Sequence, residues 1–265
     1  MLAIVFPSIN PIALQLSIYN YNIGIYWYGI AYVVGIISAQ FVAKKINNQC
    51  AIVNLSADNF DKLIVYLILG IILGGRIGYI LFYMPLLLET DFFVIFNIRG
   101  GGLSFHGGLI GVTAAILLFC YKNNKTFWGI SDIISCVAPI GIFFGRIANF
   151  VNAELVGRNT DVVWGVIFPN DHNSRHPSQL YEACIEGLLL FIIMQITLKF
   201  NYSKDRVGKL TGLFLLLYAL FRFILEFWRQ PDNHIGFFMT YFTLGQLLSI
   251  PMFILGGLLI NFSRK

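Results

Sequence analysis

Three arginines lie inside apolar stretches of this chain, where a charged side chain is costly. They are Arg76, Arg146 and Arg222. A charge at the depth of a lipid bilayer costs several kcal/mol unless it is paired or faces a water-filled cavity. The three positions therefore predict a polar site enclosed by membrane helices, and we expect the function to be built around that site.

Arg222 is the arginine with an obvious acidic partner. Glu226 follows it by four residues, so the two side chains lie on one face of a helix and can pair. Taken alone, this pair fits a structural ion pair between helices as well as it fits a site. Arg76 and Arg146 have no equally obvious acid. The resulting excess of cation predicts an anionic ligand, above all phosphate, which a guanidinium binds in planar bidentate geometry.

Glycines accompany these arginines. Gly74 and Gly75 precede Arg76, Gly145 precedes Arg146, and a glycine run covers 100–102. They suit the close approach of an anion. The run is not a P-loop, because no Gly-Lys-Ser/Thr follows it, and such a run is more often a loop hinge.

His106 is the candidate general base. It lies in the segment Ser104–Gly108, where a loop enters an apolar run, and an imidazole titrates near neutral pH. A lone histidine is more often structural than catalytic, so that alternative stays open. The polar side chains of the predicted helices gather near one membrane face, which indicates a site at that face and argues against an ion pathway through the bilayer. They are Tyr28, Arg76, Tyr79, His106, Arg146, Asn149, Arg222 and Glu226.

The elements that position these residues are predicted to be membrane helices. The chain of 265 residues is 57% hydrophobic and 12% charged, with a mean hydropathy of +0.74. It therefore has too few polar groups to cover a soluble globule. Apolar runs near the length of about 20 residues that a crossing requires predict an all-α polytopic membrane protein with about seven transmembrane helices. They fall near 23–43, 62–84, 106–121, 129–150, 179–198, 210–228 and 242–262, the third being the shortest.

Lysine and arginine predict the orientation of the chain, because cytoplasmic loops carry the excess of these residues. In a seven-helix arrangement most of them fall on one side, which places the carboxyl terminus in the cytoplasm and the amino terminus outside. The net charge of +5 is then explained by inner loops that meet an anionic leaflet, so no nucleic-acid partner is needed. We expect one integral membrane domain over 1–265, with an outer interfacial arm at 1–22 and a small outer-face loop region at 151–178.

The remaining reactive side chains predict little chemistry. Cys50, Cys120, Cys136 and Cys184 form no CxxC pair, and the histidines lack metal-ligand spacing, so we expect neither a metal nor a cofactor. Buried cysteine usually behaves as a small hydrophobe.

Several motifs together resemble those of the bacterial phosphatidylglycerol:prolipoprotein diacylglyceryl transferase family. The longest is GRIANFVNAELVGR at Gly145–Arg158. The others, in chain order, are Trp27–Gly29, Gly74–Tyr79, Ser104–Gly111, Arg175–Glu182 and Phe221–Asp232.

The resemblance implies a multi-pass enzyme of the bacterial inner membrane whose site faces the outer leaflet and the periplasm. Such an enzyme transfers the diacylglyceryl group of phosphatidylglycerol to the lipobox cysteine of a preprolipoprotein signal peptide, forms a thioether and releases glycerol phosphate. Its partners would be these substrates and membrane lipids. Residues at the matched positions are associated with activity or lipid binding: Tyr28, His106, Arg146, Asn149, Glu154, Gly157, Arg222 and Glu226.

The expected division of roles follows from this chemistry. A thiolate is the nucleophile, so a base must take the thiol proton, and His106 is the first candidate. Arg146 is expected to bind the phosphodiester with Arg222 assisting, and Arg76 is a further candidate. The catalytic and substrate-binding set also includes Tyr28, Asn149, Asn152 and Gly157. Glu154 and Glu226 are expected either to orient the arginines or to share the role of base. Two alternatives remain, a small-solute membrane transporter and a non-catalytic lipid-binding protein.

Overall fold

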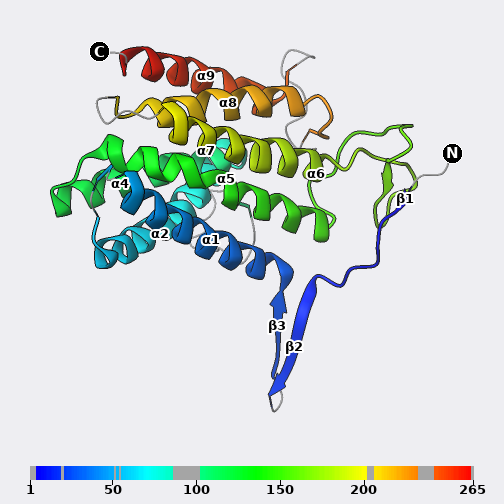
Figure 1. Cartoon of the computed structure of the whole chain (residues 1–265). Coiled ribbons are helices and arrows are strands. Elements are labelled where there is room, and N and C mark those ends of the chain that lie inside the picture. The colour runs from blue at the N-terminus through cyan, green and yellow to red at the C-terminus, as the bar shows by residue number, and fades with distance from the viewer. Residues whose placement is uncertain are drawn as a thin grey trace. The chain divides into compact units, whose positions relative to one another are not determined.

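Helices dominate the part of the chain that the computed structural model describes (Figure 1), and this part contains seven long helical segments. The structure describes residues 4–18, 21–50, 52–53, 55–85, 102–201, 206–231 and 242–263. The helices are α1 (Trp27–Cys50), α2 (Ala57–Tyr83), α4 (Phe105–Asn123), α5 (Phe127–Val151), α6 (Ser178–Glu182) continuing through the π-helical η3 (Ala183–Leu189) into α7 (Leu190–Asn201), α8 (Lys209–Leu225) and α9 (Leu244–Phe262). The predicted helical membrane fold is confirmed.

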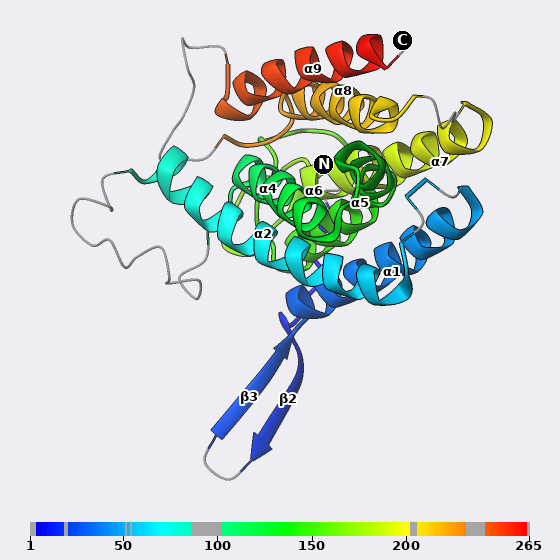
Figure 2. The same cartoon turned by 90° about the vertical axis from the view of Figure 1, so that its left-hand side faces the viewer.

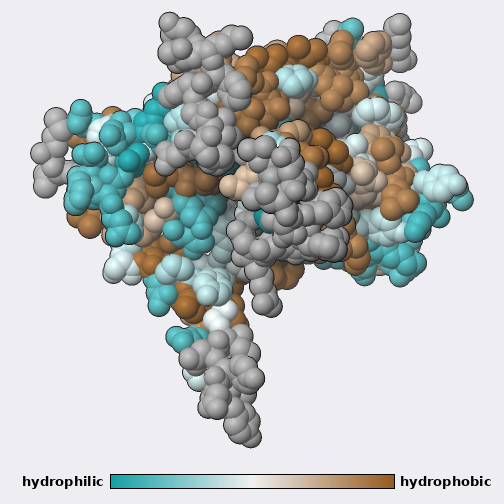
Figure 3. Space-filling model, turned by 180° about the vertical axis from the view of Figure 1, so that it is seen from behind, coloured by the Kyte–Doolittle hydropathy of each residue, from teal (hydrophilic) through white to brown (hydrophobic). Residues whose placement is uncertain are grey.

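Six of these segments are long and apolar enough to cross a membrane. The remaining one, α8, has 17 residues, close to the lower limit for a crossing helix. Exposed leucine, isoleucine and phenylalanine side chains line α8 and α9, and hydrophobic residues gather over this part of the surface in Figure 3. A lipid environment explains this exposure, because in water it would be unfavourable.

Local sequence signals account for several helix starts. Ser56 caps α2 by accepting from the Asn59 N–H, and Ser104 caps α4 by accepting from the Gly107 N–H. Thr243 and Gln246 form a reciprocal capping box at the start of α9. Each cap satisfies a backbone N–H that the first helical turn leaves without an intrahelical partner.

The amino-terminal segment contains strands that the sequence analysis did not predict. β2 (Ile12–Ile18) and β3 (Tyr21–Tyr26) pair antiparallel, and β1 (Ile4–Val5) pairs parallel with β4 (Val166–Ile167). The predicted first span therefore began too early, because 23–26 belong to β3 and the helix begins at Trp27. We predicted that this segment is an interfacial arm. Its Ile and Leu residues alternate with other residues over 12–18, which is the period of a strand.

The contacts divide the chain into two compact units, and each is described by itself. The first unit comprises Met1–Ala43 and Ile134–Lys265, and the second comprises Lys44–Ile133. Figure 2 shows α8 and α9 of the first unit running alongside one another, as they also do in Figure 1.

Glycines hold α2 and α4 of the second unit close together. A Cβ placed on Gly74 would lie 2.7 Å from Gly111 Cα, and one on Gly111 would lie 2.9 Å from Gly74 Cα. Gly70 and Gly107 make similar contacts across the crossing. Small residues four apart allow the backbones of two membrane helices to approach. Helix packing therefore explains Gly74, which the sequence analysis had associated with an anion.

Gly111→Val is expected to disrupt the second unit. The isopropyl group has no room against the Gly70 and Gly74 backbone, so α2 and α4 must separate. We expect a large drop in the yield of folded, detergent-soluble protein and in its thermal midpoint. Gly29→Val is the matched control, because a Cβ at Gly29 meets nothing within 4 Å. Equal stability of the two variants would contradict the close crossing.

Candidate active site

Six ionisable side chains form a buried ionic cluster in the first unit. Its cations are Arg146, Arg222 and Arg229, and its carboxylates are Glu182, Glu186 and Glu226. They come from α5, from the α6–η3 helix, and from α8 with the turn that follows it. The three arginine side chains are between 9% and 15% exposed, so the cluster retains limited access to its surroundings.

Glu182 is the common partner of all three arginines. Its Oε2 lies 2.9 Å from Arg146 Nη1, and its Oε1 lies 2.9 Å from Arg222 Nη1 and 3.2 Å from Arg229 Nη1. The side chain is 1% exposed. A carboxylate so deeply buried requires close cationic partners, and here it joins three separate parts of the chain.

Glu186 and Glu226 complete the cluster. Glu186 Oε2 accepts from Arg146 Nη2 at 3.2 Å, while its Oε1 lies 3.7 Å from Arg222 Nη1. Glu226 Oε2 lies 2.6 Å from Arg222 Nη2, which confirms the predicted ion pair four residues apart. Both terminal nitrogens of Arg146 and of Arg222 therefore face carboxylate oxygens.

This geometry corrects the predicted excess of cation. Arg146 has two acidic partners, Glu182 and Glu186, whereas the sequence analysis found no obvious acid for it. In their ionised forms the three arginines and three glutamates of the cluster balance. The error arose because both acids are distant from Arg146 in the sequence. Glu182 follows it by thirty-six residues, and Glu186, which accepts a hydrogen bond from it, follows by forty.

The π-helical segment explains how the two carboxylates reach Arg146. A Cβ on Gly187 would lie 2.8 Å from Phe143 Cα, so η3 contacts the backbone of α5 closely at this point. Arg146 follows Phe143 by about one helical turn, and Glu186 directly precedes Gly187. Single π turns within α-helices are frequent at functional sites. Glu182 and Glu186 stand four residues apart and so share one face of this helix, and the close contact of η3 with α5 lets both reach Arg146.

A second polar group surrounds Glu154, beyond the end of α5. Asn149 Nδ2 donates to Glu154 Oε2 at 3.4 Å, and Asn152 Nδ2 donates to Oε1 at 3.3 Å. The Tyr28 hydroxyl interacts with Asn149 and with the Glu154 charge, and it lies 3.4 Å from the Tyr32 hydroxyl. The structure thus brings together four predicted site residues, Tyr28, Asn149, Asn152 and Glu154.

The backbone on either side of Glu154 is held in an uncommon conformation. Ala153 and Leu155 have φ values of 55° and 56°, in the left-handed region that L-residues seldom adopt. The Ser178 hydroxyl donates to the Leu155 carbonyl at 3.0 Å, and the buried Gln179 amide donates to the Glu154 carbonyl. Such strain persists where surrounding contacts over-determine the conformation. The start of α6 therefore supports the turn that carries Glu154.

Gly157 lies in a tight backbone crossing. Its N–H donates to the His176 carbonyl at 3.0 Å, and its own carbonyl accepts from Arg175 Nη1 at 3.2 Å. A Cβ at this position would lie 2.8 Å from the Trp228 carbonyl oxygen. The close approach explains the need for glycine, while a role in substrate binding stays a prediction.

The loop beside this crossing contains two perturbed groups. The hydrogen bond from Arg175 lowers the pKa of the Asp171 carboxyl. Burial lowers the pKa of His176, which favours its neutral form, and its Nδ1 lies 3.2 Å from the Tyr181 hydroxyl. These contacts order the loop on the chain segment that leads into α6.

His106 and Arg76 belong to the second unit. His106 is the second residue of α4, is partly buried, and packs edge-on against the Phe105 ring with centroids 5.6 Å apart. Arg76 is 5% exposed, donates to the Gly102 carbonyl at 3.4 Å and lies 5.8 Å from the centre of the Tyr79 ring. Their roles as base and phosphate ligand stay predictions.

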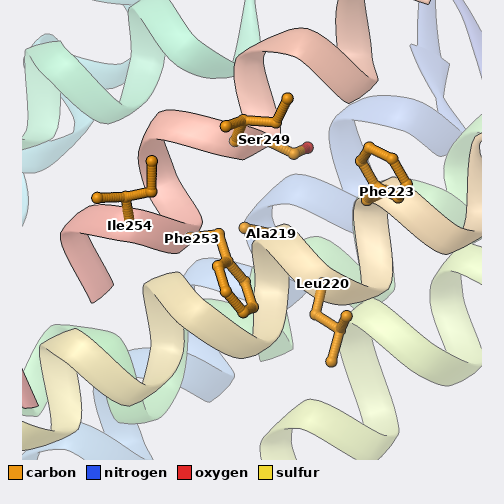
Figure 4. A pocket seen from close by; sticks show the side chains of 7 residues that line it. Ala219, Leu220, Phe223, Ser249, Phe253 and Ile254 are labelled. Carbon is orange, nitrogen blue, oxygen red and sulfur yellow. The ribbon is translucent and has the colours of Figure 1, made fainter. Parts of the chain in front are cut away.

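An apolar groove lies between α8 and α9, and its lining residues are near members of the ionic cluster in the sequence. Phe223, the residue after Arg222, lines it from α8, and Phe253 lines it from α9 (Figure 4). Its volume is about 200 Å³. The complete lining is Ala219, Leu220, Phe223, Ser249, Ile250, Phe253 and Ile254.

Sequence reasoning missed three members of the cluster. Glu182 and Glu186 were overlooked although they are charges within the predicted span 179–198, the same signal that singled out the arginines. Arg229 lies just past its predicted span, where a charge is ordinary. Only the folded chain shows Arg229 Nη1 beside Glu182.

The helices and the cluster define a multi-pass membrane protein with a buried polar site. Comparison with known proteins is more specific, since residues 11–262 match the family model described as prolipoprotein diacylglyceryl transferase. The chain belongs to this family, and it is a transferase.

Relatives of similar length support the family match. The chain is 46% identical over 256 residues to the phosphatidylglycerol–prolipoprotein diacylglyceryl transferase of Rickettsia bellii, an alignment that covers 96% of this chain and 95% of the relative. It is 44% identical over 271 residues to the enzyme of the same name from Azospirillum brasilense, covering 100% and 98%. For that of Agrobacterium fabrum the identity is 46% over 258 residues, covering 95% and 91%.

Proposed function

We propose that this chain transfers the diacylglyceryl group of phosphatidylglycerol to the thiol of the lipobox cysteine of a prolipoprotein. The observation that carries the proposal is the family match over residues 11–262. In this reaction a carbon–sulfur bond forms at the glycerol carbon that bears the phosphoester oxygen, and the carbon–oxygen bond at that carbon breaks. The thiol proton passes to a base, and glycerol phosphate leaves as an anion. This is the first step of lipoprotein maturation.

The proposed roles follow the chemistry of each group. His106 takes the thiol proton, because an imidazole is basic near neutral pH. Arg146 and Arg222 hold the phosphodiester, with Arg76 as a further candidate, since fixed cations stabilise the charge that develops on the leaving group. Supporting this assignment, the two cluster arginines retain 15% and 12% side-chain exposure.

The neighbouring polar group suits the glycerol part of the donor. Tyr28, Asn149 and Asn152 can hydrogen-bond hydroxyl groups, and they converge on Glu154. Glu154 and Glu226 orient these side chains and Arg222. The α8–α9 groove fits an acyl chain, because its lining is apolar and it begins one residue from Arg222.

The location and orientation complete the proposal. The distribution of lysine and arginine supports an outer amino terminus and a cytoplasmic carboxyl terminus in the bacterial inner membrane. The site would then face the outer leaflet and the periplasm, where the lipobox cysteine is presented.

A reconstitution assay tests the proposal. Full-length protein in phosphatidylglycerol vesicles is given a lipobox peptide, and the product is analysed by mass spectrometry for a thioether-linked diacylglyceryl group. A peptide with serine in place of cysteine and vesicles of phosphatidylethanolamine alone are the controls. A transporter or a non-catalytic lipid-binding protein would form no thioether, and absence of the product from inserted, folded protein would contradict the proposal.

The cysteines of the enzyme itself are expected to be dispensable. Cys120 and Cys136 are buried, Cys50 is partly buried and Cys184 is exposed. The acceptor thiol belongs to the peptide, so direct transfer needs no enzyme nucleophile. A variant with all four changed to alanine should transfer diacylglyceryl groups within about threefold of the parental rate, with some stability lost from the two buried positions.

The reverse outcome for that variant is informative. If the folded cysteine-free protein were inactive and restoring Cys184 alone recovered turnover, a lipidated enzyme intermediate would replace direct transfer. Restoring the buried Cys136 alone is the matched control, because it should affect only the thermal midpoint.

A further inference from the structure

The arginines proposed to bind phosphate are already occupied by carboxylates. Arg146 directs Nη1 to Glu182 and Nη2 to Glu186, and Arg222 directs Nη1 to Glu182 and Nη2 to Glu226. The two oxygens of a phosphodiester can take the bidentate position across Nη1 and Nη2 of Arg146 only by displacing one of these two acids. The identity of the displaced acid decides how the site works.

The two acids that contact Arg146 differ in how firmly they are held. Glu182 lies within 3.2 Å of all three arginines and uses both carboxylate oxygens. Glu186 has one contact at 3.2 Å, and its other oxygen is 3.7 Å from Arg222. That second oxygen is buried and has no hydrogen-bond partner among the described residues.

We propose that Glu182 is the fixed positioning residue of the arginines, and that Glu186 is a placeholder that the substrate phosphate displaces from Arg146. The inference rests on the proposed function, which assigns phosphate to Arg146 and Arg222. Displacing Glu186 from Arg146 breaks one contact of 3.2 Å. Displacing Glu182 would break the contacts to Arg146, Arg222 and Arg229 at once. The ligand is the anionic phosphodiester of the lipid donor, and the released glycerol phosphate, a phosphomonoester, presents anionic phosphate oxygens to the same arginines.

The placeholder has a consequence for turnover. A cluster whose charges already balance binds a further anion weakly, because Glu186 remains close and repels it. The same repulsion helps glycerol phosphate to leave after the carbon–oxygen bond has broken, when Glu186 returns to Arg146. Glu186 thus limits both substrate affinity and product retention, while Glu182 keeps the arginines in place for each cycle.

Two isosteric substitutions are expected to change phosphate affinity in opposite directions. Glu186→Gln removes the repelling charge, so the dissociation constant for glycerol phosphate and the KM for phosphatidylglycerol should each fall at least about tenfold. Because the product then leaves slowly, kcat should fall as well. Glu182→Gln loosens all three arginines, so the same dissociation constant and KM should rise at least about tenfold.

The measurement uses the full-length protein in detergent and in nanodiscs. Calorimetry gives the affinity for glycerol phosphate, and the thioether assay gives kcat, KM and product inhibition. Asp58→Asn is the control, because Asp58 is an exposed acid that pairs with Lys62 at the start of α2. It should change none of these quantities.

Each outcome decides the proposal. If both variants bind glycerol phosphate more tightly, only the charge matters and Glu182 is not a positioning residue. If both bind it more weakly, Glu186 has a structural role and is not displaced by phosphate. Unchanged affinity in both would remove phosphate from the cluster. If Glu182→Gln does not fold, Glu182→Asp keeps the charge at a shorter reach and should still weaken binding, while unchanged binding would overturn its role. Failure of the proposed function is seen separately, as absence of thioether product from the parental protein.

Discussion

Arg146→Lys is expected to lower the rate of diacylglyceryl transfer at least about a hundredfold. In the folded chain the guanidinium spans two carboxylates, with Nη1 2.9 Å from Glu182 and Nη2 3.2 Å from Glu186. An ammonium keeps the charge but cannot present two parallel donors in one plane. The variant therefore loses the pair of guanidinium donors that connects α5 to the α6–η3 helix. The same pair is proposed to bind the phosphate.

The transfer rate must be measured per molecule of inserted protein. Thioether product is followed by mass spectrometry, and a thermal midpoint shows whether the variant retains its fold. Arg206→Lys is the matched control, because Arg206 is exposed ahead of α8, and it should behave as the parent. Near-parental turnover of Arg146→Lys would remove Arg146 from the phosphate site.

His106→Asn is expected to produce the second large effect. Asparagine preserves hydrogen-bonding size at the first turn of α4 but cannot accept a proton near neutral pH, so the rate should fall by about 10² to 10⁴. In the parent, protonation of the imidazole on acidification removes the base, which gives the pH profile an acidic limb. That limb should vanish in the variant.

A pH–rate series compares the parent, His106→Asn and His172→Asn. His172 is exposed in the loop between β4 and α6, so its replacement should leave both the rate and the profile unchanged. If His106→Asn keeps the parental rate and acidic limb, the base must be one of the carboxylates, with Glu154 and Glu226 the first to test.

The helical membrane fold could be predicted because its signals are local. Apolar runs of membrane-crossing length predicted all seven helical segments, and the four-residue spacing of Arg222 and Glu226 predicted their ion pair, which is confirmed at 2.6 Å. The β2–β3 hairpin was not predicted, because a short apolar run next to a membrane span can be either a strand or the start of a helix.

The arrangement of charge at the site depended on tertiary structure. The sequence alone indicated that Arg76, Arg146 and Arg222 lie within membrane segments, because length and hydropathy decide which segments cross the bilayer. It could not determine which charges meet, and it left Arg146 without an acid. Only the packing of Gly187 against Phe143 and the three-way contact of Glu182 show that acids occupy the arginines. Ion pairing depends on a few ångströms of separation between helices, and residues forty positions apart acquire that separation only when the chain is folded.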